Sequence, residues 1–83
     1  MEERELTFGE KAVGLTFNPG NNSEVDKIKK LYAEIIDIMD ELRRNSTAPD
    51  GIDYSIDRSR LCSIAITEAQ TAQMWAVKAI TWK

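Results

Sequence analysis

Residues 23–44, SEVDKIKKLYAEIIDIMDELRR, carry the clearest structural signal in this 83-residue chain. Ser23 is a good helix N-cap, and Asp26 lies at the N3 position of an imperfect capping box, S-x-x-D rather than S-x-x-E. The first turn is acidic and the last turn, which ends with Arg43 and Arg44, is basic, and both charges suit the helix dipole. The sequence therefore predicts a helix over 23–44 with its cap at Ser23.

The apolar side chains of this helix cover more than one of its faces. They recur every three or four residues, which is the spacing of an amphipathic helix. One row comprises Ile28, Tyr32, Ile35, Met39 and Leu42, and a second comprises Leu31, Ile35, Ile38 and Leu42. Together the two rows are wider than a single partner helix can cover, so the sequence predicts more than one packing partner.

Residues 55–81 are predicted to form a second, longer helix, and the loop 45–54 connects it to the first. Within the loop, the run Pro-Asp-Gly at 49–51 favours a turn. Small side chains recur with heptad spacing along the second helix, at Cys62, Ala65, Ala69, Ala72, Ala76 and Ala79. Because small side chains let helix backbones approach closely, we expect this row at a close contact between chains. Trp75 and Trp82, seven residues apart, are expected in the core or at an interface.

Residues 1–22 form an arm that precedes the two helices. Within it, EKAV at 10–13 has room for one or two helical turns, and Pro-Gly-Asn-Asn at 19–22 favours a turn. We therefore predict an all-α fold in one domain over 1–83: an antiparallel αα-hairpin of two long helices with a short N-terminal helical or turn segment. Two helices cannot close a core, so the excess apolar surface predicts a helical homo-oligomer.

The composition argues against several classes of function. The chain has 14 acidic and 11 basic residues, no histidine and one cysteine. A net acidic domain lacks the basic face that DNA or RNA binding needs. Without histidine or a Cys/His cluster, we expect no metal site, no cofactor and no catalytic residues, and therefore no enzyme. The chain also lacks a signal peptide and the roughly 20-residue apolar run of a membrane span, so we expect a cytosolic protein without membrane contact.

Three polar clusters are candidate binding sites. Residues 15–20 (LTFNPG) and the lysines of 27–30 combine an aromatic ring, an amide, a turn and positive charge, which suits a small phosphorylated ligand with a base. Arg58 and Arg60 begin the second helix, where oligomer symmetry can gather copies of one arginine on an axis. Residues 67–73 (TEAQTAQ) are polar within an apolar helix and need partners if they are buried.

Each cluster also has a plain structural interpretation. Phe17 could pack on the first turn of the helix, and the lysines could form a solvated face. Arg60 could form a local ion pair with Asp57, which would be worth little. The polar stretch 67–73 could simply face water. From the residues alone, these alternatives stay open.

Three runs of the sequence resemble a known family. They are FGEKAVGLTFNPG (8–20), VDKIKKLYAEIIDIMDEL (25–42) and RLCSIAITEAQTAQMWAVKAITW (60–82). Together they resemble the small phage anti-defence sponges, which include the anti-CBASS cyclic-nucleotide sponges and the Thoeris anti-defence proteins with the same helical hairpin. The third run is the most specific part of the resemblance.

The resemblance implies a binding protein that performs no catalysis. Members of the family are helical homo-oligomers, commonly hexamers, that sequester nucleotide messengers made by bacterial immune enzymes. For this chain it implies the sequestration of cyclic dinucleotides, cyclic trinucleotides or both, with cyclic ADP-ribose isomers as a further candidate. The place of action would be the cytoplasm of the infected bacterial host.

The resemblance also implies two kinds of pocket. In the family, dinucleotide pockets lie between two protomers and use an aromatic residue before the first long helix and a lysine on that helix. The matching residues here are Phe17, Asn18, Lys29 and, as the alternative aromatic residue, Phe8. Trinucleotide pockets lie on three-fold axes and use an arginine near the start of the last helix and polar residues beyond it. The matching residues here are Arg60, Thr67 and Thr71.

Two other functions compete with this one. A structural or protein-interaction hairpin, such as an antitoxin-like protein or a phage accessory subunit, would place its apolar faces against another protein. It would form a stable hetero-complex and show no nucleotide-dependent change in melting temperature. A phosphodiesterase for the same messengers ranks third, because the chain lacks histidine and metal-binding clusters, and it would be identified by product formation.

Overall fold

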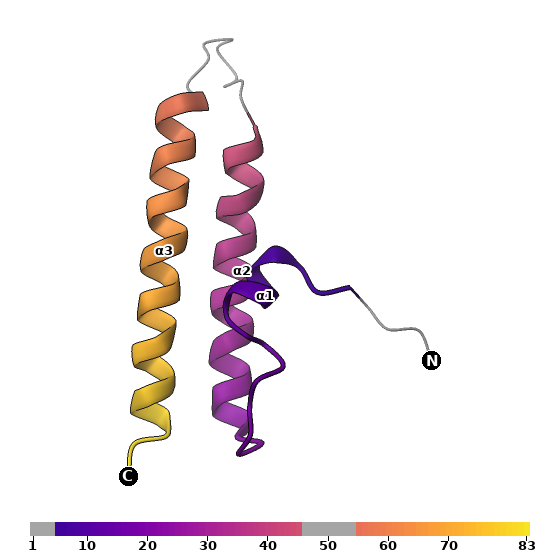
Figure 1. The fold of residues 1–83 in the computed structure, drawn as a ribbon, viewed down its shortest axis with the longest axis vertical. Coiled ribbons are helices and arrows are strands. Elements are labelled where there is room, and N and C mark those ends of the chain that lie inside the picture. Colours follow the sequence, from indigo (N-terminus) through magenta and orange to yellow (C-terminus); the bar gives the residue numbers. More distant parts are fainter. Residues whose placement is uncertain (1–4, 46–54) are drawn as a thin grey trace.

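The fold consists of two long antiparallel helices and one short helix that packs on them (Figure 1). The structure is a computed structural model, and it describes residues 5–45 and 55–83. Helix α1 spans Phe8–Ala12, α2 spans Ser23–Arg44 and α3 spans Ser55–Ile80. No strand occurs among the described residues, and the predicted all-α hairpin is confirmed there. Residues 1–4 of the arm and 46–54 of the predicted loop, with its turn at 49–51, lie outside the described residues.

The start of α2 is fixed by the residue before the predicted cap. The Asn22 side chain caps the helix, because its Oδ1 accepts hydrogen bonds from the backbone N–H groups of Glu24 at 2.8 Å and Val25 at 3.2 Å. The predicted cap at Ser23 is therefore wrong by one residue. Asn and Ser are both favoured caps, so their order in the sequence could not decide between them.

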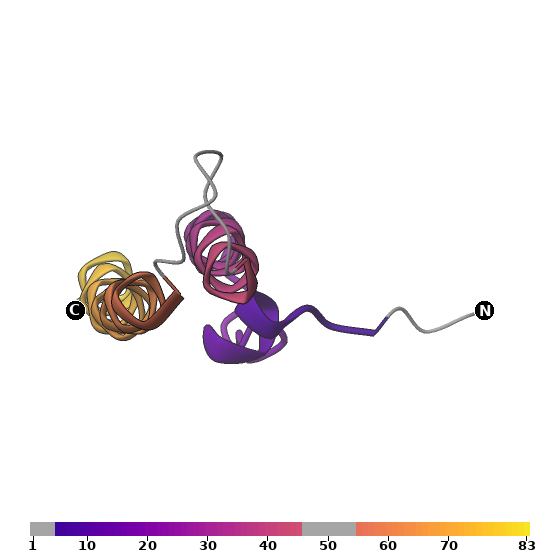
Figure 2. The same ribbon diagram turned by 90° about the horizontal axis from the view of Figure 1, so that it is seen from above.

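The hydrophobic core lies where the three helices meet. Ile36 of α2 is fully buried, and Val13, Ala33 and Ile66 surround it. Partly buried apolar side chains complete this cluster, namely Ala12, Leu15, Tyr32, Met39 and Ala69. The Cα atoms extend 50 Å along the longest axis but only 14 Å along the shortest, and Figure 2 shows this thin arrangement from above. A chain of this shape can cover few side chains completely.

A large apolar surface therefore stays uncovered on the protomer. The second row of α2, formed by Leu31, Ile35, Ile38 and Leu42, is 37% to 60% exposed. This confirms that α2 carries more apolar surface than one partner helix covers. Trp75 and Trp82 are also exposed, so the interpretation that they belong to the protomer's core is wrong. Within the described residues, no helix combines the length and apolar character needed to cross a membrane.

The small side chains of α3 do not form one outward face. Cys62 is buried and Ala69 packs against the core, whereas Ala72 and Ala79 are exposed. Residues three or four apart on a helix point in somewhat different directions. A heptad row of small residues therefore forms two neighbouring lines along the helix surface, which are called ridges here. One ridge of this row lies against the rest of the protomer, and only the other is available to a second chain. Helix α3 itself ends at Ile80, one residue before the predicted end.

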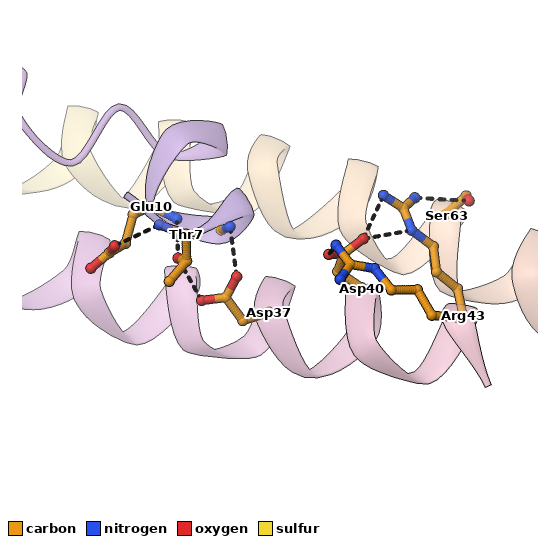
Figure 3. Close-up of polar contacts among 8 residues, drawn as sticks. Thr7, Glu10, Asp37, Asp40, Arg43 and Ser63 are labelled. Carbon is orange, nitrogen blue, oxygen red and sulfur yellow. Dashed lines mark hydrogen bonds and ion pairs between the residues drawn. The ribbon is translucent and has the colours of Figure 1, made fainter. Parts of the chain in front are cut away.

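Helix α1 is anchored to α2 through its N-terminal end. Thr7 and Glu10 form a capping box, in which the Glu10 N–H donates to Thr7 Oγ1 at 3.1 Å and the Thr7 N–H donates to Glu10 Oε1 at 2.8 Å. Asp37 of α2 accepts two further hydrogen bonds, from Thr7 Oγ1 and from the Gly9 N–H, both at 2.7 Å (Figure 3). A carboxylate at a helix N-terminus is favourable. The arm is thereby fixed on α2.

Candidate functional site

A cleft lies at the end of the hairpin where α2 begins and α3 ends. Its volume is about 570 Å³. The arm turn and the end of α3 provide its walls, and the first turns of α2 lie between them. Its lining consists of Phe17, Asn18, Pro19, Gly20, Asn22, Val25, Lys29, Val77, Ile80, Thr81, Trp82 and Lys83. The structure therefore brings together three residues of the predicted dinucleotide pocket: Phe17, Asn18 and Lys29.

Asn18 shapes the cleft through hydrogen bonds within the arm turn. Its Nδ2 donates to the Asn22 carbonyl oxygen at 2.8 Å, and its Oδ1 accepts from the Asn22 N–H at 3.1 Å. The turn also contains Asn21 with φ of 50°, a conformation that asparagine tolerates better than most residues. The Asn18 amide is thus occupied in closing the turn, which gives this residue a structural role.

Lys29 is a buried cation in the wall of the cleft. Its side chain is on α2, the residue is 5% exposed, and its Nζ donates to the carbonyl oxygens of Gly14, at 3.0 Å, and of Phe17. The same Nζ lies 5.5 Å from the centroid of the Phe17 ring. No carboxylate among the described residues pairs with it. Because a buried charge without a counter-charge is costly, this ammonium is suited to an incoming anion.

Phe17 is open to solvent. It is 72% exposed, so the interpretation that its ring packs on the first turn of α2 is wrong. Its backbone is held in place, since its N–H donates to the Gly14 carbonyl oxygen at 2.9 Å and its own carbonyl oxygen accepts from Lys29. The neighbouring Lys30 is exposed and pairs with Asp26 at 3.0 Å. Of these two lysines, only Lys29 lines the cleft.

Phe8 does not belong to this cleft. It begins α1, and its ring centroid lies 5.1 Å from Cζ of Arg43. The arm packs back along α2, which carries Phe8 away from the turn at residues 18–22 (Figure 1). Within a protomer, Phe17 is therefore the ring beside Lys29, and Phe8 is not brought to the same cleft.

The predicted trinucleotide residues lie on α3, outside this cleft. Arg60 and Thr67 border a shallow hollow with Ser63, Ile64 and Glu68, and Thr71 is not part of its lining. Both threonines are exposed, and their hydroxyls donate to carbonyl oxygens one turn earlier, each at 3.1 Å. Arg60 is exposed and forms no ion pair with Asp57, so the local-pair interpretation is wrong. One protomer supplies only one copy of these groups.

A polar network supports the helix pair beside Arg60. Asp40 is buried and pairs with Arg43 at 2.8 Å and with Arg44. Arg43 Nη1 donates to Ser63 Oγ at 3.3 Å, which links α2 to α3 (Figure 3). Arg43, Ser63 and Arg60 also border a second shallow hollow with Ile56 and Ser59. The network therefore fixes the surface from which Arg60 projects.

Trp82 and Lys83 are residues of the cleft that sequence reasoning missed. No local pattern could have assigned them, because only the antiparallel return of α3 brings them to the arm. No group of three His, Cys, Asp or Glu side chains that could hold a metal ion occurs in the described parts of the chain.

Comparisons with known proteins bear on the whole hairpin. Neither the curated proteins nor the solved structures contain a match to this chain. A family model described as "Acb2/Tad1, hairpin domain" matches residues 10–81, which include most of α1, all of α2 and α3, and the predicted residues of both pockets except Phe8. The chain belongs to the Acb2/Tad1 hairpin-domain family.

Proposed function

We propose that the protein binds cyclic oligonucleotide second messengers of bacterial anti-phage signalling and sequesters them without degrading them. The observation that supports this most directly is the buried Lys29 ammonium, which lines the cleft without a carboxylate partner among the described residues. A ligand phosphate would provide the missing counter-charge, and the exposed Phe17 ring would stack on a base.

The charge of the cleft supports an anionic ligand. Its lining contains Lys29 and Lys83 and no acidic side chain, although the whole chain has a net charge of −3. Positive charge is thus concentrated where the aromatic ring lies. Such a site attracts and orients a nucleotide, whereas the acidic remainder disfavours long nucleic acids.

Oligomer formation belongs to the same proposal. The exposed row Leu31, Ile35, Ile38 and Leu42 would pack against other copies, and a hexamer would match the assembly implied by the resemblance. A partner copy would close the cleft, which is open to solvent on one protomer. Copies of Arg60, Thr67 and Thr71 would meet on three-fold axes and form a separate trinucleotide pocket.

The place of action and the absence of turnover are further parts of the proposal. The messengers are made inside the infected bacterium, so the protein would act in the host cytoplasm. It would need no cofactor or metal, because sequestration requires tight binding and slow release rather than chemistry.

Thermal unfolding with a ligand panel tests this function. The panel contains cyclic dinucleotides, cyclic trinucleotides and cyclic ADP-ribose isomers. At 100 times the Kd, a ligand stabilises the folded state by about 2.7 kcal/mol, which raises the melting temperature of a small domain by several degrees. We expect such a shift with at least one class, followed by recovery of the ligand intact. Ligand conversion would identify a phosphodiesterase instead.

A protein-interaction hairpin is the second candidate, and the exposed apolar row on α2 favours it. This row could receive a different protein as readily as a second copy. A stable hetero-complex and no thermal shift with any nucleotide, at concentrations where the purified protein keeps its own assembly, would support that function and reject sequestration.

A further inference from the structure

The end of α3 brings a second aromatic ring to the cleft that contains Phe17. Trp82 and Phe17 line the same cleft, although they lie at opposite ends of the chain. Trp82 is 73% exposed, so most of its indole surface is free for contact with a ligand. The two rings come from the two walls of the cleft, which are the arm turn and the end of α3.

Trp82 is held by the structure around it. The Thr81 N–H donates to the Val77 carbonyl oxygen at 3.0 Å, and the Trp82 N–H donates to the Ala79 carbonyl oxygen at 3.4 Å, so helical hydrogen bonds continue past the end of α3. Nζ of Lys78 lies 5.8 Å from the centroid of the Trp82 ring, within the range of a cation–π contact. The backbone of Trp82 is therefore held at the end of α3, and its indole makes a cation–π contact with Lys78.

Other groups that line the cleft are suited to a nucleotide. Lys29 lies 5.5 Å from the centroid of the Phe17 ring, and Val25 adds an apolar side chain beside it. Two aromatic walls can sandwich a planar heteroaromatic ring, and an ammonium next to one wall can contact its phosphate. A simple dicarboxylate would leave both rings without a stacking partner.

We infer that Trp82 is a specificity-determining residue that stacks on a nucleobase held against Phe17, and that it makes the cleft prefer purine to pyrimidine bases. The inference rests on the proposed function, because it assigns a residue to the same site. A purine offers two fused rings to the indole and a pyrimidine offers one, so removal of the indole costs the purine ligand more.

Calorimetric titration with two probes tests this role. The probes are 3′,3′-cyclic diadenylate and 3′,3′-cyclic diuridylate, and the proteins are the wild type, Trp82→Ala, Trp82→Phe and Trp75→Ala. Loss of one stacking contact weakens binding about 5- to 150-fold. We expect a loss in that range for diadenylate with Trp82→Ala, a smaller loss for diuridylate, and substantial recovery with Trp82→Phe.

Trp75→Ala is the matched control. Trp75 is also exposed and also lies near Lys78, whose Nζ is 5.4 Å from its ring centroid, but it does not line the cleft. This variant should bind diadenylate within about twofold of the wild type, since it removes no stacking contact. In Trp75→Phe, where Trp82 is the only tryptophan, diadenylate should quench the emission of Trp82.

The outcomes separate this inference from the proposed function. If the wild type binds neither these probes nor any other cyclic nucleotide, the proposed function fails and the inference fails with it. If the wild type binds diadenylate and Trp82→Ala binds it equally well, only the inference fails. Equal losses for both probes would also overturn it, because Trp82 would then act without base preference. Absence of quenching in Trp75→Phe would mean that the ligand does not reach Trp82. A change in the sedimentation mass of Trp82→Ala would mean that Trp82 acts through assembly.

Discussion

Gly9 of α1 lies directly against Ala33 of α2. A Cβ atom placed on Gly9 would lie 2.1 Å from the Ala33 carbonyl oxygen and 2.8 Å from Oδ1 of Asp37. The nearer obstacle is backbone, which cannot rotate away as a long side chain can. The same Gly9 donates its N–H to Asp37, so the short helix packs on α2 too closely for a side chain at this position.

This crossing predicts that Gly9→Ala destabilises the fold by displacing α1. Overpacking in a close contact typically costs about 1–3 kcal/mol. Urea denaturation of the variant should show a loss of unfolding free energy in that range. Gly20→Ala is the control, because nothing lies within 4 Å of a Cβ at Gly20 and its φ is not positive. Equal midpoints for the two variants would show that α1 does not pack on α2 as described.

The long helices could be predicted from the sequence because their signals are local. The three- and four-residue spacing of apolar side chains and the charged first and last turns lie within α2 itself. The N-cap was misplaced by one residue because Asn22 and Ser23 are both competent caps. The bounds of α1 were missed, although Thr7 and Glu10 have the T-x-x-E spacing of the capping box that they form.

The site could be predicted only in part. Phe17 and Lys29 lie twelve residues apart with a turn between them, and the structure places Nζ of Lys29 5.5 Å from the centroid of the Phe17 ring. The contribution of Trp82 depends on the return of α3, which no local pattern contains. The sequence does not show that α1 folds back along α2, which places Phe8 outside this cleft within one protomer.

Lys29→Met should weaken both ligand binding and stability. The substitution removes the ammonium that bonds to two arm carbonyls and the positive charge that a ligand phosphate would contact. A lost hydrogen bond that leaves a buried partner unsatisfied costs about 1–3 kcal/mol. We expect a lower melting temperature and at least tenfold weaker binding of a cyclic dinucleotide, measured by calorimetry.

Lys30→Met is the control for this change. Lys30 is exposed and forms a surface ion pair with Asp26, and such pairs contribute between zero and about 1 kcal/mol. Its stability and dinucleotide affinity should stay near those of the wild type. If Lys30→Met loses binding and Lys29→Met does not, the ligand approaches a solvent-facing lysine, and the cleft is not the dinucleotide site.

If copies of the chain assemble through the apolar row of α2, as proposed, Ile38→Asp should dissociate them without unfolding the protomer. Ile38 is 60% exposed and central in the apolar row of α2, so aspartate there meets water in the monomer but would be buried unpaired between copies. Sedimentation equilibrium should give a lower mass than for the wild type, while circular dichroism keeps its helical signal. Ile38→Leu keeps the apolar surface and should keep the assembly. An unchanged mass for Ile38→Asp would mean that this row does not join the copies.

Arg60→Ala should abolish trinucleotide binding and leave dinucleotide binding intact. Arg60 is exposed on α3, far along the hairpin from Lys29, and it forms no ion pair with a carboxylate of the described residues. If copies of Arg60 meet on a three-fold axis, each loses a charge-assisted hydrogen bond worth about 1.5–3 kcal/mol, so the combined loss exceeds a factor of ten. Parallel titrations with a cyclic trinucleotide and a cyclic dinucleotide measure both sites.

Arg58→Ala is the matched control for Arg60→Ala, because it removes the same charge from the same helix. Arg58 itself borders a different hollow, an apolar groove with Met39, Leu42 and Leu61. This variant should leave trinucleotide affinity unchanged.

The double variant Lys29→Met with Arg60→Ala should show the sum of the two single effects, since distant sites without shared partners act additively. Normal trinucleotide binding by Arg60→Ala would exclude an axial site at this arginine, whereas loss of both ligands would indicate that Arg60 acts on assembly.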